Sequence, residues 1–184
     1  DYIGTKTCDY IDGYAKRASF NGPFSLCLNN AQTSLFVGEI GNKTIRRVNL
    51  VDNLLVSSVS TPQTSRKKLI CMSSPNGICI SKDESIMYLA ESTSSDILHM
   101  DMISSLLTQP FKKELGAKKV IHFNDCILDE NKSMKIAKCS LTLFLILPDY
   151  LYASHSKGII RIHTKLKNIV FIGSQKHGYI DGTF

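Results

Sequence analysis

The stretch Pro23-Phe24-Ser25-Leu26-Cys27-Leu28 returns 52 positions later as Pro75-Asn76-Gly77-Ile78-Cys79-Ile80. The match continues without gaps, because Leu35-Phe36-Val37-Gly38-Glu39 returns as Met87-Tyr88-Leu89-Ala90-Glu91. Short apolar runs separated by turn residues are typical of β-strands rather than of helices. Recurrence at a fixed period of this size predicts a repeat architecture, in which every unit is one small structural element.

A third and weaker copy follows, with its opening at residues 123–128, its middle at 151–155 and its end at 159–162. The two ends of the chain also match each other, because Ile3-Gly4 and Ile172-Gly173 precede similar Asp-Gly segments. The sequence therefore predicts one domain with units at about residues 10–60, 61–115 and 116–175, and the start of a fourth at 176–184.

Compared with the second unit, the third carries extra residues at about 133–148, and most of them are apolar. Such a run is unusual at the tip of a hairpin. Three interpretations stay open for it: a loop that docks on a partner, an extra strand that folds back under the repeat, or a segment that a faulty gene model has introduced.

Each unit contains four short apolar segments with turn signals between them, for example Gly41-Asn42 in the first unit. We predict four short strands per unit, with residues 26–28 as a buried inner strand. A four-stranded unit cannot bury both of its faces alone, so neighbouring units must cover them. The predicted fold is all-β: a partial β-propeller of about three four-stranded antiparallel blades.

The first unit resembles the NHL repeat in Asp12-Gly13, Phe20-Asn21, Pro23, residues 35–37 and residues 45–48. The resemblance is good over about residues 10–60, moderate over 70–102 and weak over 118–184. It implies a propeller that acts as a scaffold for protein–protein interaction. Because closed propellers have four to eight blades, we expect the remaining blades from a longer chain or from a second copy.

Composition narrows the classes of function only a little. A formal charge of +6 permits weak attraction to RNA, anionic lipid or acidic proteins without demonstrating any of them. The most apolar run, residues 141–147, is much too short to span a bilayer as a helix, so no membrane span is expected.

Six cysteines would suit a secreted disulfide protein, but four of them lie in or beside apolar runs, which favours buried thiols. The compartment stays open, with the cytoplasm favoured.

Basic residues cluster before each predicted inner strand. They are Lys16, Arg17, Arg66, Lys67, Lys68, Lys118 and Lys119. The turns after each second strand contain Glu39, Glu91 and His155, with Lys43 and Lys157 close by. If the repeat holds, these loops and turns emerge on one face, which is the candidate binding face.

A protein partner is the first expectation for this face, and an RNA backbone is the alternative. The aromatic residues mostly lie inside strand patterns, which disfavours sequence-specific RNA recognition by stacking. A metal-dependent lyase or hydrolase of the propeller type is the enzyme alternative. The five histidines share no equivalent position in the units, so no metal site, catalytic residue or cofactor is expected, and an enzyme is the less favoured class.

Overall fold

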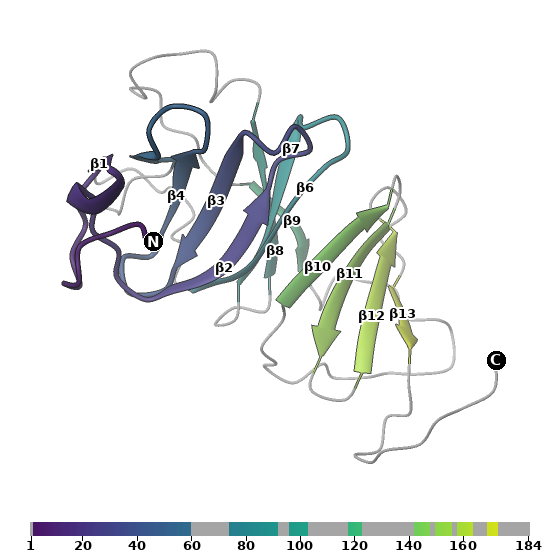
Figure 1. Ribbon diagram of the computed structural model, residues 1–184. Coiled ribbons are helices and arrows are strands. Elements are labelled where there is room, and N and C mark those ends of the chain that lie inside the picture. Colours follow the sequence, from purple (N-terminus) through teal and green to yellow (C-terminus); the bar gives the residue numbers. More distant parts are fainter. Residues whose placement is uncertain are drawn as a thin grey trace.

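A computed structural model of the chain describes residues 2–59, 74–91, 96–102, 118–122, 142–147, 150–155, 158–163 and 169–172 (Figure 1). In this part of the chain the strands form three antiparallel sheets. The only helical element among the described residues is a single turn of 3-10 helix, η1 (Ala15–Arg17). The expected all-β class is therefore confirmed.

The first sheet is a meander of four strands to which a short fifth strand is added. Its strands are β1 (Gly13–Tyr14), β2 (Pro23–Leu28), β3 (Ser34–Glu39), β4 (Thr44–Asn49) and β5 (Leu55–Ser58). Their order is β1-β5-β4-β3-β2, so β2 and β1 form the two edges. Pro23 opens the edge strand β2, where its missing N–H costs no ladder hydrogen bond.

The other two sheets are four-stranded meanders. The second contains β6 (Pro75–Ile80), β7 (Ile86–Glu91), β8 (Asp96–Asp101) and β9 (Lys118–His122). The third contains β10 (Thr142–Leu147), β11 (Tyr150–His155), β12 (Gly158–His163) and β13 (Ile169–Ile172). In each sheet the strands lie in chain order.

The sequence repeat is reproduced in the pairing of the strands. Phe36 pairs with Cys27 on one side, and Tyr88 pairs with Cys79 in the same way. The register shifts between Pro23 and Ser25 in the first sheet and between Pro75 and Gly77 in the second, again 52 positions apart. The 52-residue period is therefore a structural period.

The first strands of the three sheets lie next to one another, with β2 beside β6 and β6 beside β10. Figure 1 shows the sheets following one another around this row of strands. Sheets arranged radially around their inner strands are the blades of a propeller. The structure is therefore a partial β-propeller of three antiparallel blades, as the sequence predicts.

The main core lies between the first and second sheets, where the sheets cover each other. Its buried residues are Phe36, Ile45, Val59, Ile78, Ile80, Met87, Leu89, Met100 and Met102. Burial of one such side chain contributes roughly 1.5–3 kcal/mol, so the contact between the blades, rather than either sheet alone, stabilises this part of the fold.

A second core lies on the opposite face of the first sheet. Val37, Val48 and Val56 are buried there, and Ala18 and Phe20 from the segment before β2 pack against them. Residues 2–22 thus cover the β3–β5 part of this face. They leave β2 uncovered.

Two expectations from the sequence need correction, and a third concerns residues that the structure does not describe. Leu26 and Leu28 are 64% and 48% exposed, so the expected burial of residues 26–28 is wrong for these two side chains, because no sheet covers that face of β2. Lys118 and Lys119 open the fourth strand of the second sheet instead of a loop before an inner strand. Residues 123–128, the expected opening of the third unit, lie outside the described residues.

The apolar segment that the alignment treats as an insertion contributes a strand to the third sheet. Its residues Thr142–Leu147 form β10, which pairs with β11. β10 has the place in the third sheet that β2 and β6 have in the first two. An apolar run can lie there because its backbone is paired and neighbouring strands adjoin it. The rest of the predicted insertion lies outside the described residues.

We expect Gly38→Ala to destabilise the protein by about 1–3 kcal/mol, because it overpacks the contact between two blades. A Cβ at Gly38 would meet Ser25 Oγ and would lie 2.9 Å from the Pro75 carbonyl oxygen, which is backbone and cannot rotate away. At Gly41 the three atoms nearest to a Cβ all belong to the Asn21 side chain, which can move. Urea unfolding of Gly38→Ala and the control Gly41→Ala measures the difference, and equal costs would contradict the close approach.

Candidate functional site

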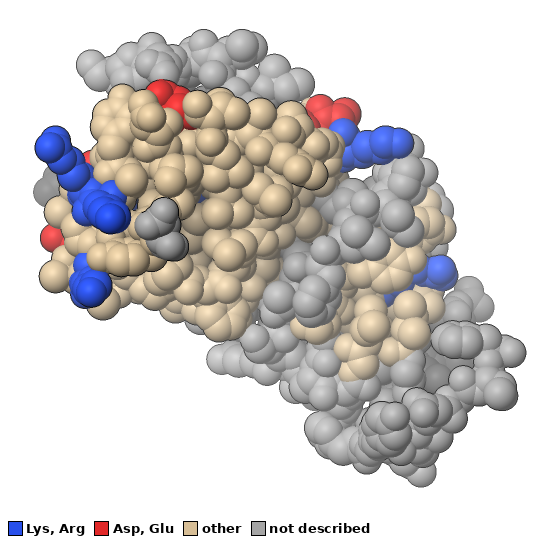
Figure 2. Space-filling model, in the orientation of Figure 1, with Lys and Arg blue, Asp and Glu red and all other residues tan. Residues whose placement is uncertain are grey.

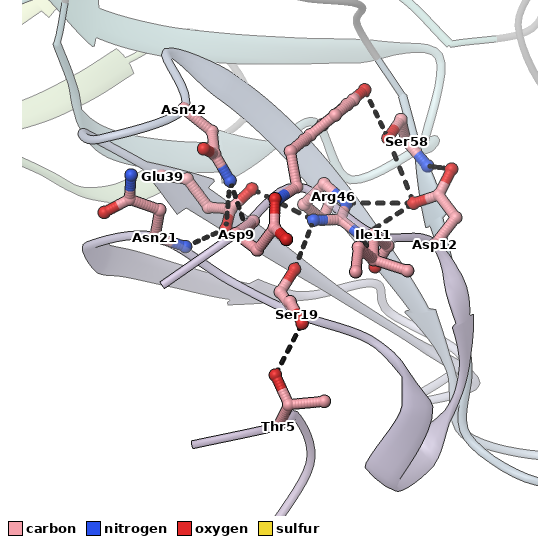
Figure 3. Close-up of polar contacts among 11 residues, drawn as sticks. Thr5, Asp9, Ile11, Asp12, Ser19, Asn21, Glu39, Asn42, Arg46 and Ser58 are labelled. Atoms are coloured by element: carbon pink, nitrogen blue, oxygen red, sulfur yellow. Dashed lines mark hydrogen bonds and ion pairs between the residues drawn. The ribbon is translucent and has the colours of Figure 1, made fainter. Parts of the chain in front are cut away.

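Arg46 on β4 is fully buried and is surrounded by acceptors (Figure 3). Its Nη2 lies 2.6 Å from Asp12 Oδ1, and its Nη1 lies 3.3 Å from Glu39 Oε2. Nη1 also donates to the Ser19 carbonyl oxygen at 2.9 Å, and Nη2 to the Ile11 carbonyl oxygen at 2.7 Å. These bonds compensate the cost of removing the guanidinium from water.

Glu39, at the end of β3, is also fully buried and uses both carboxylate oxygens. Its Oε1 accepts a hydrogen bond from the Asn21 N–H at 2.7 Å and from Asn42 Nδ2 at 3.1 Å. The backbone adds two hydrogen bonds between the same loops, from the Ile40 N–H to the Gly22 carbonyl and from the Gly41 N–H to the Asn21 carbonyl. Glu39 therefore joins the loop before β2 to the turn between β3 and β4.

Asp12 connects the same network to the outer strand of the sheet. Its Oδ2 accepts a hydrogen bond from the Ser58 N–H at 3.0 Å. The Tyr10 hydroxyl donates to Ser58 Oγ at 2.6 Å, and the Tyr10 ring centroid lies 5.0 Å from the Arg46 guanidinium carbon. The segment from Tyr10 to Asn21 is thus fastened to the sheet by charged groups as well as by apolar contact.

The residues of the candidate binding face are distributed between two ends of the first sheet. Lys43 is exposed in the turn between β3 and β4, where it adopts a φ of 54°, and Glu39 is buried beneath that turn. Lys16 and Arg17 are exposed in η1. Tyr14 pairs with Leu55 and the Ala15 N–H donates to the Leu54 carbonyl, which places η1 at the β4–β5 turn, the opposite end.

The second strands of all three sheets end at equivalent positions. Glu91 ends β7 and pairs with Asp96, as Glu39 ends β3 and pairs with Thr44. His155 ends β11 and pairs with Gly158. The sequence alignment of these three positions is thus reproduced in the backbone. Arg66, Lys67, Lys68 and Lys157 lie outside the described residues.

Sequence reasoning missed an exposed apolar row on β2. Phe24, Leu26 and Leu28 are 59%, 64% and 48% exposed and point to the same side of the strand. Figure 2 shows the surface over β2 free of Lys, Arg, Asp and Glu. The alternation of these three residues with Ser25 and Cys27 was the available signal, since it separates two faces of the strand.

Metal and redox sites have no support in the described part of the chain. It contains no group of three or more His, Cys, Asp or Glu residues that could hold an ion. Cys8, Cys27 and Cys79 are free thiols, and burial raises the pKa of both Cys27 and Cys79 above the ordinary value of a thiol. The neutral thiol form is a poor nucleophile and metal ligand. The described residues contain no helix that is long and apolar enough to span a bilayer.

No family model and no curated protein matches this sequence. Among solved structures, it is similar to hydrazine synthase of Kuenenia stuttgartiensis, with a TM-score of 0.52 and 13% identity over 89% of this chain and 38% of that one. It is also similar to a chain of a nidogen/laminin complex, with a TM-score of 0.52 and 13% identity over 81% of this chain and 47% of that one. A protein of unknown function from Bacteroides thetaiotaomicron has a TM-score of 0.50 and 10% identity over 93% of this chain and 48% of that one.

These identities are too low to indicate more than the fold, which is that of β-propeller-type proteins. The chain spans less than half the length of each of these three structures. The sheets, the row of inner strands and the comparisons agree, and the chain is part of a β-propeller.

Proposed function

We propose that this chain belongs to a propeller of the NHL type and acts as a scaffold that binds a protein partner. The proposed contact surface is the end of the blades at which each second strand turns into the third. The observation that supports it is the buried Arg46–Glu39 pair, because this pair holds two neighbouring loops in fixed positions at that end.

A surface is suited to specific binding when rigid elements support its loops, since little conformational entropy is then lost on association. In the first blade the two loops are held in place by hydrogen bonds from Asn21 and Asn42 to the buried Glu39 carboxylate. Lys43 and Gly41 remain exposed in the turn between β3 and β4. β7 and β11 end at the positions equivalent to the end of β3, so the same end of all three blades can contribute to one surface. The exposed Lys43 and the positive charge of the chain suit a partner with an acidic patch.

RNA binding through a basic face is the alternative, and it needs basic residues gathered on one side. Lys16 and Arg17 lie at one end of the first sheet and Lys43 lies at the other. The described residues thus divide the expected basic face instead of joining it. No observation among them favours a metal-dependent lyase or hydrolase.

The proposal is tested with Lys43→Glu and with Lys82→Glu as the matched control. Lys82 is also exposed, but it lies in the β6–β7 hairpin at the opposite end of the blades. The immobilised protein first captures its partner, and biolayer interferometry then measures the association rate. We expect Lys43→Glu to slow association several-fold and Lys82→Glu to leave it unchanged. Equal association for both variants, or capture that ribonuclease abolishes, would contradict the proposal.

A further inference from the structure

The exposed row on β2 occupies positions that are buried one blade further on. Leu26 and Leu28 pair with Val37 and Leu35, just as Ile78 and Ile80 pair with Leu89 and Met87. Ile78 and Ile80 are only 4% and 8% exposed, because they pack against Phe36 and Ile45 of the first sheet. We call Phe24, Leu26 and Leu28 the leading face. The equivalent row in the second blade is covered by an apolar face of the neighbouring sheet, so a surface of the same kind is suited to cover the leading face.

The third sheet exposes the complementary positions. Its pairs Tyr152–Arg161 and Ser154–Ile159 have the register of Phe36–Arg47 and Gly38–Ile45, so Ile159 is the equivalent of Ile45. Ile45 is fully buried, whereas Ile159 is 45% exposed. We call Tyr152, Ile159, Val170 and Ile172 the trailing face.

The outer strand of the third sheet is likewise more exposed than its equivalent in the first sheet. Ile172 pairs with Ile159, while in the first sheet the Val59 N–H donates to the Ile45 carbonyl. Val59 is 6% exposed and belongs to the core, but Ile172 is 37% exposed and Val170 is 42% exposed. The two terminal faces are therefore the two halves of a contact that the chain already makes between its first and second sheets.

We infer that the leading face of one copy of this chain docks on the trailing face of a second copy. The contact repeats the packing of Phe36, Ile45 and Val59 against Ile78 and Ile80, with Tyr152, Ile159 and Ile172 of one copy against Leu26 and Leu28 of the other. It involves the inner part of this face of the first sheet, which is β2, since residues 2–22 cover the β3–β5 part. Figure 2 shows this inner part without charged side chains, which suits burial against an apolar surface.

The contact is of the head-to-tail type, which forms a closed ring only when its rotation closes. The described residues of each copy form three blades, so two copies contribute six, and six is within the range of four to eight blades in closed propellers. Two identical contacts then bury both terminal faces of both copies.

Light scattering after size exclusion tests the inference on the full chain over a range of concentrations. We expect a mass twice 20.5 kDa. Leu26→Lys and Ile159→Lys each place a charge in the contact, and each is expected to weaken association more than about a hundredfold. Val51→Lys is the control, because Val51 is 74% exposed in the β4–β5 turn, outside both faces.

Mixing the two variants distinguishes a head-to-tail contact from other dimers. Leu26→Lys retains the trailing face and Ile159→Lys retains the leading face, so the mixture is expected to form a heterodimer although each variant alone is monomeric. A monomeric wild type, a mass that grows beyond two copies, or a dimer that survives either substitution would overturn the inference. Circular dichroism confirms that both variants are folded, since each replaces an exposed side chain.

Discussion

Arg46→Ala is expected to lower the free energy of unfolding by about 3–5 kcal/mol, the usual cost of breaking a buried ion pair by removal of one partner. The cost arises mainly at Glu39, whose side chain is fully buried and would keep a charge without its cation. Loss of the cation costs less free energy at Asp12, because its side chain is 48% exposed and can be hydrated. Urea unfolding followed by circular dichroism measures the change.

Three further variants separate the charge effect from the loss of a large side chain. Arg47 lies on the opposite face of β4 and donates one hydrogen bond to Ser34 Oγ at 2.9 Å, so Arg47→Ala should cost only about 1 kcal/mol. Arg46→Met keeps apolar volume, and adding Glu39→Gln to it removes the unpaired charge. We expect the double variant to be more stable than Arg46→Met alone. The opposite order would show that Glu39 does not depend on Arg46.

Phe36→Ala is expected to cost about 3–5 kcal/mol, because it opens a cavity in the core between the first and second blades. Phe36 is 1% exposed, whereas Phe24, on the neighbouring strand, is 59% exposed. Phe24→Ala should therefore change the stability of a single copy by less than about 0.5 kcal/mol.

The comparison is best made by urea unfolding in the Leu26→Lys background, in which association of two copies does not contribute. The same phenylalanine-to-alanine change is then measured at a buried position of β3 and at an exposed position of the adjacent strand β2. Similar costs at both positions would show that the face of β2 is covered in the single copy, contrary to its exposure in this structure.

The period of the repeat and the strands of the first two blades could be predicted from sequence. Phe36 and Tyr88 take equivalent places because their flanking turn residues and strand alternation are local signals. The third blade was harder, since its inner strand β10 has no Pro at its start and lies within the segment that the alignment treats as an insertion. An apolar run alone does not say which neighbour its backbone pairs with.

The candidate binding face was predictable only in part. Glu39, Glu91 and His155 were matched correctly as the ends of the second strands. The separation of Lys16 and Arg17 from Lys43 could not be predicted, because it depends on β1 pairing with β5 over more than 40 residues of chain. The burial of Glu39 likewise depends on Arg46 and on the distant loop at Asn21.

The sequence by itself determined that this protein is an array of small antiparallel units, of which the first two repeat at a period of 52, because alternation and turn chemistry act within a few residues. Only the tertiary structure decided which face of each strand is covered, which end each loop occupies, and that Asp12, Glu39 and Arg46 meet. Burial and charge pairing depend on neighbours that are distant in the chain, and the packing of the blades brings those neighbours together.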